Sequence, residues 1–154
     1  MYQIPKKGLT VWRLYGVFKT LFIVLLVAVC IFLTVFFDWP IFMEYIAVAI
    51  GIITAVTSIW LFPKIRWEHW RYEVREHEIE IQSGLFIVTT TLIPMVRVQH
   101  VDTSQGPILK KYDLANISIS TAATTHIIPM LITSDADNLR ARISELARVA
   151  EDDV

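Results

Sequence analysis

Two long apolar segments dominate the first 62 residues of the chain. Thr20–Phe37 and Tyr45–Phe62 each contain 18 residues without Asp, Glu, Lys, Arg or His. An α-helix rises 1.5 Å per residue, so each segment is roughly 27 Å long, close to the hydrocarbon thickness of a bilayer. We therefore predict two transmembrane helices, at about 12–37 and 41–62, joined by a tight turn that contains Trp39.

From Trp70 onward the apolar positions follow a period of two, which is typical of strands in an antiparallel sheet. Strands are expected around Tyr72–Val74, Ile79–Ile81, 85–93, 95–101, 116–121 and 126–133. In this prediction Gln82-Ser83-Gly84 is a turn and the next strand resumes at Leu85. The stretch 108–114 is expected to be a short helical or irregular crossing.

After Thr133 the period becomes helical. Ser134 is a good N-cap, and Leu139, Ile143, Leu146 and Ala150 form one apolar stripe. The predicted fold is therefore a two-helix transmembrane hairpin followed by a mainly-β barrel of about seven antiparallel strands, capped by one C-terminal α-helix. This outline fits a PH-like barrel, although periodicity alone leaves several small barrels possible, and it places the domains at 1–65 and 66–154.

Basic residues flank the two apolar segments on the side of the chain termini. The connection from Asp38 to Glu44 contains two acids and no Lys or Arg. The positive-inside rule therefore places both termini, and the domain at 66–154, in the cytoplasm. The basic residues that carry this prediction are Lys6, Lys7, Arg13, Lys19, Lys64, Arg66, Arg71 and Arg75.

Overall composition narrows the classes of partner. The mean hydropathy of +0.52 is high for a soluble protein, and the net charge of -1 argues against nucleic acid as a partner. Cys30 is the only cysteine and lies inside the first apolar segment, so the sequence predicts no intrachain disulfide and no lipidation of Cys30.

Candidate catalytic and metal-binding residues are scattered. The four histidines, His69, His77, His100 and His126, lack the short spacing of a metal motif. No nucleophile elbow or phosphate-binding loop is present. We therefore expect no enzyme activity, no metal and no cofactor.

Basic and aromatic residues near the second apolar segment suggest contact with lipid headgroups. The residues expected to make that contact are Arg66, Trp67, Trp70, Arg71, Lys110 and Lys111. The expected loop Arg75-Glu76-His77-Glu78 carries two acids, which disfavours recognition of phosphoinositides by that loop.

One stretch of the β-rich part resembles a known family. It contains Arg97, Gln99, His100, Val101, Gln105, Gly106 and Leu114. This motif, placed after a two-helix hairpin, resembles the bacterial membrane-flanked proteins with a PH-like domain, the YdbS-like family. Asp113 departs from the pattern, which has Gly before the Leu. The resemblance covers nearly the whole chain.

The resemblance implies a non-enzymatic module in the bacterial inner membrane. It further implies pairing with another membrane protein, a larger relative with several copies of the domain, and a role in envelope stress or resistance. Binding of a lipid or small ligand by the barrel at the membrane surface is the alternative function.

Overall fold

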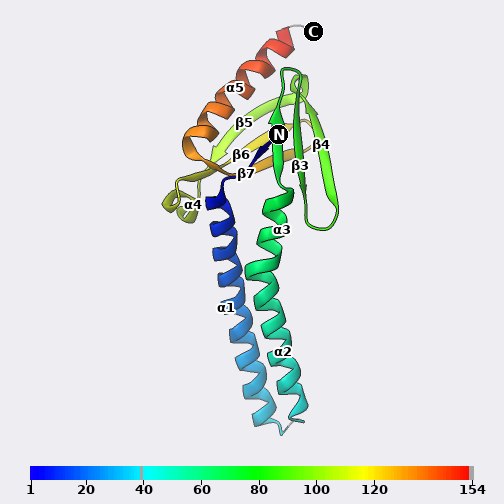
Figure 1. Ribbon diagram of the computed structural model, residues 1–154, viewed down its shortest axis with the longest axis vertical. Helices are drawn as coiled ribbons and strands as arrows, with labels where there is room; N and C mark the ends of the chain where they lie inside the picture. Colours follow the sequence, from blue (N-terminus) through cyan, green and yellow to red (C-terminus); the bar gives the residue numbers. More distant parts are fainter. Residues whose placement is uncertain (39, 153–154) are drawn as a thin grey trace. The chain divides into compact units, whose positions relative to one another are not determined.

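The computed structural model of the chain describes residues 1–38 and 40–152 (Figure 1). They form two compact units, Trp12–Ile65 and Met1–Val11 with Arg66–Val154. All of 1–65 was expected to belong to the hairpin domain, whereas the structure groups the first eleven residues with the C-terminal part. Strand pairing by Tyr2–Gln3 holds them there, a contact between distant residues that no local pattern indicates. Trp39, expected in the outer turn, lies outside the described residues.

The helical unit is an antiparallel hairpin (Figure 1). Its first helix is α1 (Lys6–Phe36). Its second arm consists of α2 (Phe42–Val56), the π-helical segment η1 (Thr57–Leu61) and α3 (Phe62–His69). The start of α1 and the end of α3 continue into the other unit. Both arms are long and apolar enough to cross a membrane by length and composition. The two predicted helices are confirmed, although the first begins earlier, at Lys6, and the second arm ends later, at His69, than predicted.

The predicted second helix, 41–62, stops just before Pro63, but in the structure Pro63 does not end the second arm. The Phe62 N–H bonds to the Thr57 carbonyl, which is the five-residue spacing of a π-turn. This wider turn changes the hydrogen-bond register just before Pro63, which then lies in the first turn of α3. Proline is tolerated in a first helical turn because its missing N–H has no intrahelical partner there. The helix therefore continues to His69.

The second unit contains seven strands in two antiparallel sheets. One sheet has the order β1 (Tyr2–Gln3), β2 (Arg71–Val74), β3 (Glu78–Gly84) and β4 (Val88–Pro94). The other has the order β5 (Val98–Ser104), β6 (Leu114–Thr121) and β7 (Thr125–Ile132), and the short helix α4 (Pro107–Lys111) joins β5 to β6. The predicted PH-like fold with about seven strands is confirmed, but its first strand precedes the helical hairpin.

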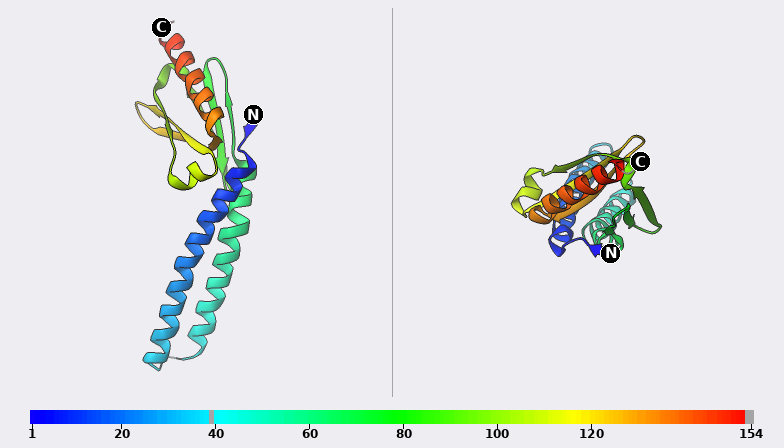
Figure 2. Two further views of the ribbon diagram at one scale, coloured as in Figure 1. Left: turned by 90° about the vertical axis from the view of Figure 1, so that its left-hand side faces the viewer. Right: turned by 90° about the horizontal axis from the view of Figure 1, so that it is seen from above.

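The C-terminal helix α5 (Thr133–Asp152) closes this unit and packs against β5, β6 and β7 (Figure 2). Its fully buried Ala136 and Ile143 are seven residues apart, so both lie on the same helix face. They belong to a core that includes the fully buried Ile117 and Ile119 of β6. The predicted closing helix is confirmed.

Two strand boundaries differ from the sequence prediction. Residues 95–97 form a 3-10 turn, η2 (Met95–Arg97), so β5 starts at Val98 rather than at Met95. Leu85, Phe86 and Ile87 form the loop of the β3–β4 hairpin instead of resuming a strand, because Gly84 already pairs with Val88. Apolar β-formers at a loop tip cannot be distinguished from a strand by local propensity.

The backbone at Asp113, the residue that departs from the family pattern, has a positive φ. Asp113 follows α4 and adopts a φ of 57°, the left-handed conformation that glycine adopts with least strain. Its N–H bonds to the Lys110 carbonyl and its own carbonyl accepts from the Thr133 N–H. The departure from the family pattern is accommodated in this turn without loss of the fold.

Candidate functional site

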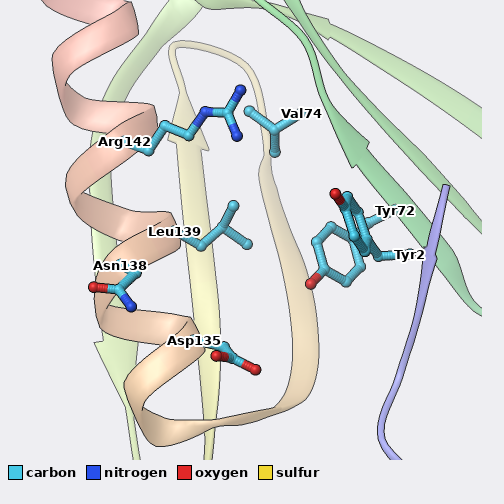
Figure 3. A pocket seen from close by; sticks show the side chains of 7 residues that line it. All are labelled: Tyr2, Tyr72, Val74, Asp135, Asn138, Leu139 and Arg142. Carbon is cyan, nitrogen blue, oxygen red and sulfur yellow. The ribbon is translucent and has the colours of Figure 1, made fainter.

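A pocket of about 350 Å³ lies between α5 and the first two strands (Figure 3). Tyr2 comes from β1, and Tyr72 and Val74 come from β2. The opposite wall is formed by one face of α5, and the complete lining is Tyr2, Tyr72, Val74, Asp135, Asn138, Leu139 and Arg142. All seven residues belong to the same compact unit.

Within each element, periodicity keeps the pocket side chains on one face, and strand pairing brings β1 beside β2. On α5, positions 135, 138, 139 and 142 recur at the spacing that keeps side chains on one helical face. On β2, Tyr72 and Val74 are two residues apart and so point to the same side of the sheet. Tyr2 is the direct cross-strand partner of Tyr72, and their ring centroids are 6.0 Å apart.

The pocket offers opposite charges at its two ends. Asp135 and Arg142 are seven residues apart on α5, which corresponds to roughly 10 Å of helix rise. Figure 3 shows the carboxylate and the guanidinium directed toward the cavity from these two levels, with Leu139 between them. A polar ligand with separated positive and negative groups fits this arrangement, and the apolar side chains of Val74 and Leu139 would contact its middle.

The phenol of Tyr72 stays protonated to higher pH than usual. Burial raises the pKa of Tyr72 above its ordinary value of 10.0, and the negative charge of Asp135 and the neighbouring Tyr2 raise it further. At neutral pH the Tyr72 hydroxyl is protonated, as in any tyrosine, and can donate a hydrogen bond at the wall of the pocket.

This raised pKa predicts a pH-dependent stability. Above pH 10 there is a range in which the folded state retains the Tyr72 proton and the unfolded state has lost it. The contribution of this group to the free energy of unfolding is therefore complete below that range. It is then lost as the pH rises through the folded-state pKa. We expect the free energy of unfolding to fall above about pH 10, and the fall to be smaller in Tyr72→Phe. Denaturant unfolding of the full chain at several pH values measures this, with Tyr112→Phe as the control.

The residues expected to contact headgroups differ in their exposure to solvent. Arg66, Arg71, Lys110 and Lys111 are exposed, the two lysines at the end of α4. Trp70 is only 5% exposed and so belongs to the core of its unit, which corrects the expectation that its ring meets lipid directly. Trp67 is half-buried, and its indole N–H donates to the Ile4 carbonyl over 2.8 Å. Headgroup contact by the four exposed cations stays a prediction.

The family motif contributes mainly to the fold. Gln105 donates from its amide to the Leu114 carbonyl at 2.9 Å and to the Thr133 hydroxyl at 3.1 Å. It therefore links the end of β5 to the starts of β6 and α5. Leu114 is fully buried and Gly106 caps α4. The remaining motif residues lie in η2 and β5, where Arg97, Gln99 and His100 are exposed and Val101 is half-buried.

A second hollow, of about 300 Å³, lies in the helical unit. It is formed between α1 and α2 and is almost entirely apolar, with the lining Cys30, Leu33, Thr34, Met43, Ile46, Ala47 and Ile50. Thr34 is satisfied internally, because its hydroxyl donates to the Ile31 carbonyl at 2.8 Å and lies 3.2 Å from the Glu44 carboxylate. We call this hollow the hairpin groove.

The described residues contain no group of three or more His, Cys, Asp or Glu side chains able to hold a metal ion. Sequence reasoning missed both hollows. For the pocket, the available signal was the helical spacing of Asp135, Asn138 and Arg142, but the pairing of Tyr2 with Tyr72 joins residues 70 positions apart. For the hairpin groove, the available signal was the small residue Ala47, but the sequence does not identify its partner on α1.

Comparison with known proteins identifies the relatives of the chain. The model of the family described as "Bacterial PH domain" matches residues 20–147. The chain is 51% identical over 152 residues to the UPF0699 transmembrane protein YdbS of Bacillus subtilis strain 168, covering 99% of this chain and 96% of that protein. The family resemblance predicted from the motif is thereby confirmed.

A second relative is a different transmembrane protein of the same organism. The chain is 31% identical over 80 residues to the UPF0699 transmembrane protein YdbT, which covers 51% of this chain and 15% of that protein. No solved structure matches the chain.

Proposed function

The chain belongs to the bacterial PH domain family, and on that premise we propose that it is a non-enzymatic, membrane-anchored module that binds another membrane protein. Two helices suited to crossing a membrane supply the anchor, and the PH-like unit supplies a folded surface. The partner we expect, from the family resemblance, is a larger relative carrying several copies of the domain.

The observation that carries this proposal is the hairpin groove. Inside a bilayer, helices associate through close packing rather than through the hydrophobic effect, and small side chains at the contact allow that packing. Cys30 and Ala47 are the small side chains of the groove, which otherwise presents aliphatic surface. A transmembrane helix of a partner that inserts a bulky side chain there would gain van der Waals contact that mobile lipid chains do not supply.

Affinity purification of the full-length protein from native membranes in mild detergent, followed by mass spectrometry, tests the proposal. Ala47→Leu fills the groove, whereas Ala49→Leu adds the same atoms on an exposed face of α2 outside it. Overpacking costs about 1–3 kcal/mol, so recovery of the partner is expected to fall roughly tenfold or more with Ala47→Leu. Recovery should be unchanged with Ala49→Leu. Equal recovery of the partner with both variants would show that the partner does not bind in the hairpin groove.

The location of the termini is part of the same proposal. We place the chain in the bacterial inner membrane with both termini in the cytoplasm, because basic residues flank the spans on that side and the connection is acidic. In a Cys30→Ser background, a cysteine at Ile41 is expected to react with a membrane-impermeant maleimide in intact spheroplasts. A cysteine at Ser134 should react only after permeabilisation, and the opposite pattern would reverse the orientation.

The pocket between α5 and β2 supports a second candidate function, binding of a lipid headgroup or a small polar ligand. The separated charges of Asp135 and Arg142 and the tyrosine side chains in its wall are the observations that favour it. The same purification tests this candidate: recovery of the protein with a discrete small molecule, lost in Arg142→Ala, would support it. The role in envelope stress or resistance implied by the resemblance would be tested by deleting the gene and measuring growth under antimicrobials that act on the envelope.

A further inference from the structure

The β3–β4 hairpin has a charged end and an apolar end. At one end of β3, the exposed Arg75 guanidinium forms ion pairs with three carboxylates at 2.9 to 3.2 Å, those of Glu73, Glu78 and Glu80. At the other end, the chain turns through Leu85, Phe86 and Ile87. The whole stretch from Ile81 to Val96 contains no Asp, Glu, Lys, Arg or His. The hairpin is thus polarised along its length.

The apolar end, Leu85 to Val88, is exposed. Ile87 is 83% and Phe86 is 79% exposed, the two largest exposed fractions among the large apolar side chains of the described residues. Hairpin loops normally consist of Gly, Asn, Asp, Ser or Pro, since these residues suit both tight turns and water. Two adjacent bulky apolar side chains at a loop tip therefore indicate a surface that meets something other than water. We call Leu85–Val88 the apolar tip.

The apolar tip lies next to the residues that follow the second span. Ser83, Gly84 and Leu85 line one small cavity of about 240 Å³ with Arg66 and Trp70. Arg66 is four residues beyond Phe62, the last residue of the apolar run 45–62, and α3 continues through both. At 1.5 Å per residue, Arg66 lies about 6 Å beyond the end of that run. The headgroup layer on each side of the hydrocarbon core is roughly 5–7 Å thick, so Arg66 lies within it.

We propose that the apolar tip of the β3–β4 hairpin inserts into the interface of the bilayer that holds the helical hairpin. Because the tip lies beside Arg66, it is at headgroup depth. No charged side chain between Ile81 and Val96 has to be desolvated when the tip enters the bilayer interface. Aromatic and aliphatic side chains gain from leaving water at this depth. The charged end around Arg75 lies at the other end of β3, about 20 Å away for seven strand residues. The tip would thus fix the orientation of the PH-like unit, independently of any protein partner.

Depth-dependent quenching in vesicles tests this proposal with the full-length chain. In a Cys30→Ser background, one variant carries Ile87→Cys and the matched control carries Glu76→Cys, at the opposite end of β3. Each is labelled with an environment-sensitive fluorophore and reconstituted into phosphatidylcholine–phosphatidylglycerol vesicles that contain lipids with a nitroxide on the upper acyl chain. Flotation with the vesicles and an unchanged melting temperature establish that both variants are anchored and folded.

We expect the label at position 87 to lose roughly twofold more emission than the label at position 76, because only the former reaches the layer that contains the quencher. Adding Phe86→Asp to the Ile87→Cys variant should abolish the difference. Equal quenching at the two positions would overturn the proposal. A blue-shifted label at 87 that the lipid does not quench would also overturn it, since a protein surface would then cover the tip.

Discussion

Replacing Gly16 by Ala is expected to destabilise the helical hairpin by about 3 kcal/mol. A Cβ at Gly16 would lie 2.4 Å from the Ser58 carbonyl oxygen and 3.2 Å from the Ile59 Cα. Both atoms belong to the backbone of η1, so a side-chain rotation cannot relieve the clash and the arms must separate. Elsewhere in a helix, Gly→Ala stabilises by roughly 0.5–1 kcal/mol, so the predicted sign is opposite to the ordinary one.

Thermal unfolding of the full-length protein in mild detergent measures this effect. Gly51→Ala is the matched control, since its Cβ would approach only the Val27 Cγ2 at 3.3 Å, the end of a side chain that can adjust. The melting temperature should fall markedly in Gly16→Ala and change little in Gly51→Ala. Similar melting temperatures for the two variants would show that the arms do not approach closely at Ser58.

Replacing Gly84 by Ala is expected to disrupt the β3–β4 hairpin, at a cost of about 3 kcal/mol. A Cβ at Gly84 would lie 2.0 Å from the Ile87 carbonyl oxygen and 2.9 Å from the Val88 Cα. Gly84 also has a φ of 159°. The three-residue loop therefore cannot close in its present form around any residue that carries a Cβ.

Amide hydrogen exchange across residues 79–93, with the melting temperature, measures the effect of Gly84→Ala. Faster exchange confined to this hairpin, together with a lower melting temperature, is the expected result. Gly106→Ala serves as the control because its Cβ would meet no atom within 4 Å. If the amides of Gly84→Ala exchanged as slowly as those of the unaltered chain, the hairpin would not contain the tight loop described for Leu85, Phe86 and Ile87.

The fold could be predicted wherever a single local pattern suffices. A bilayer requires about 20 apolar residues in a helix whose backbone bonds are internal, so the two uncharged runs lead directly to the hairpin. Strands and helices that bury one side show a characteristic spacing of apolar residues. This spacing indicated the strands after Trp70 and the C-terminal helix that buries Ile143. The ends of these elements were less predictable, since η1 allows the second arm to pass through Pro63.

The candidate sites depended on contacts between distant residues. Trp70 has an amphipathic ring that suits a membrane interface, yet the folded unit leaves it only 5% exposed. The apolar tip was predicted as a strand, because Leu85, Phe86 and Ile87 have high strand propensity and only the pairing of Gly84 with Val88 shows that they form a loop.

The sequence by itself determined the two membrane helices, the strand-rich unit with its closing helix, and the family, because hydrophobic period and a contiguous motif are local properties of the chain. Only the tertiary structure decided that Tyr2 pairs with Tyr72 beside Asp135, that Gly16 meets Ser58, and that the apolar tip lies beside Arg66. These juxtapositions depend on strand register and helix packing, which are set by the simultaneous burial of residues from several segments and are therefore not encoded in any one of them.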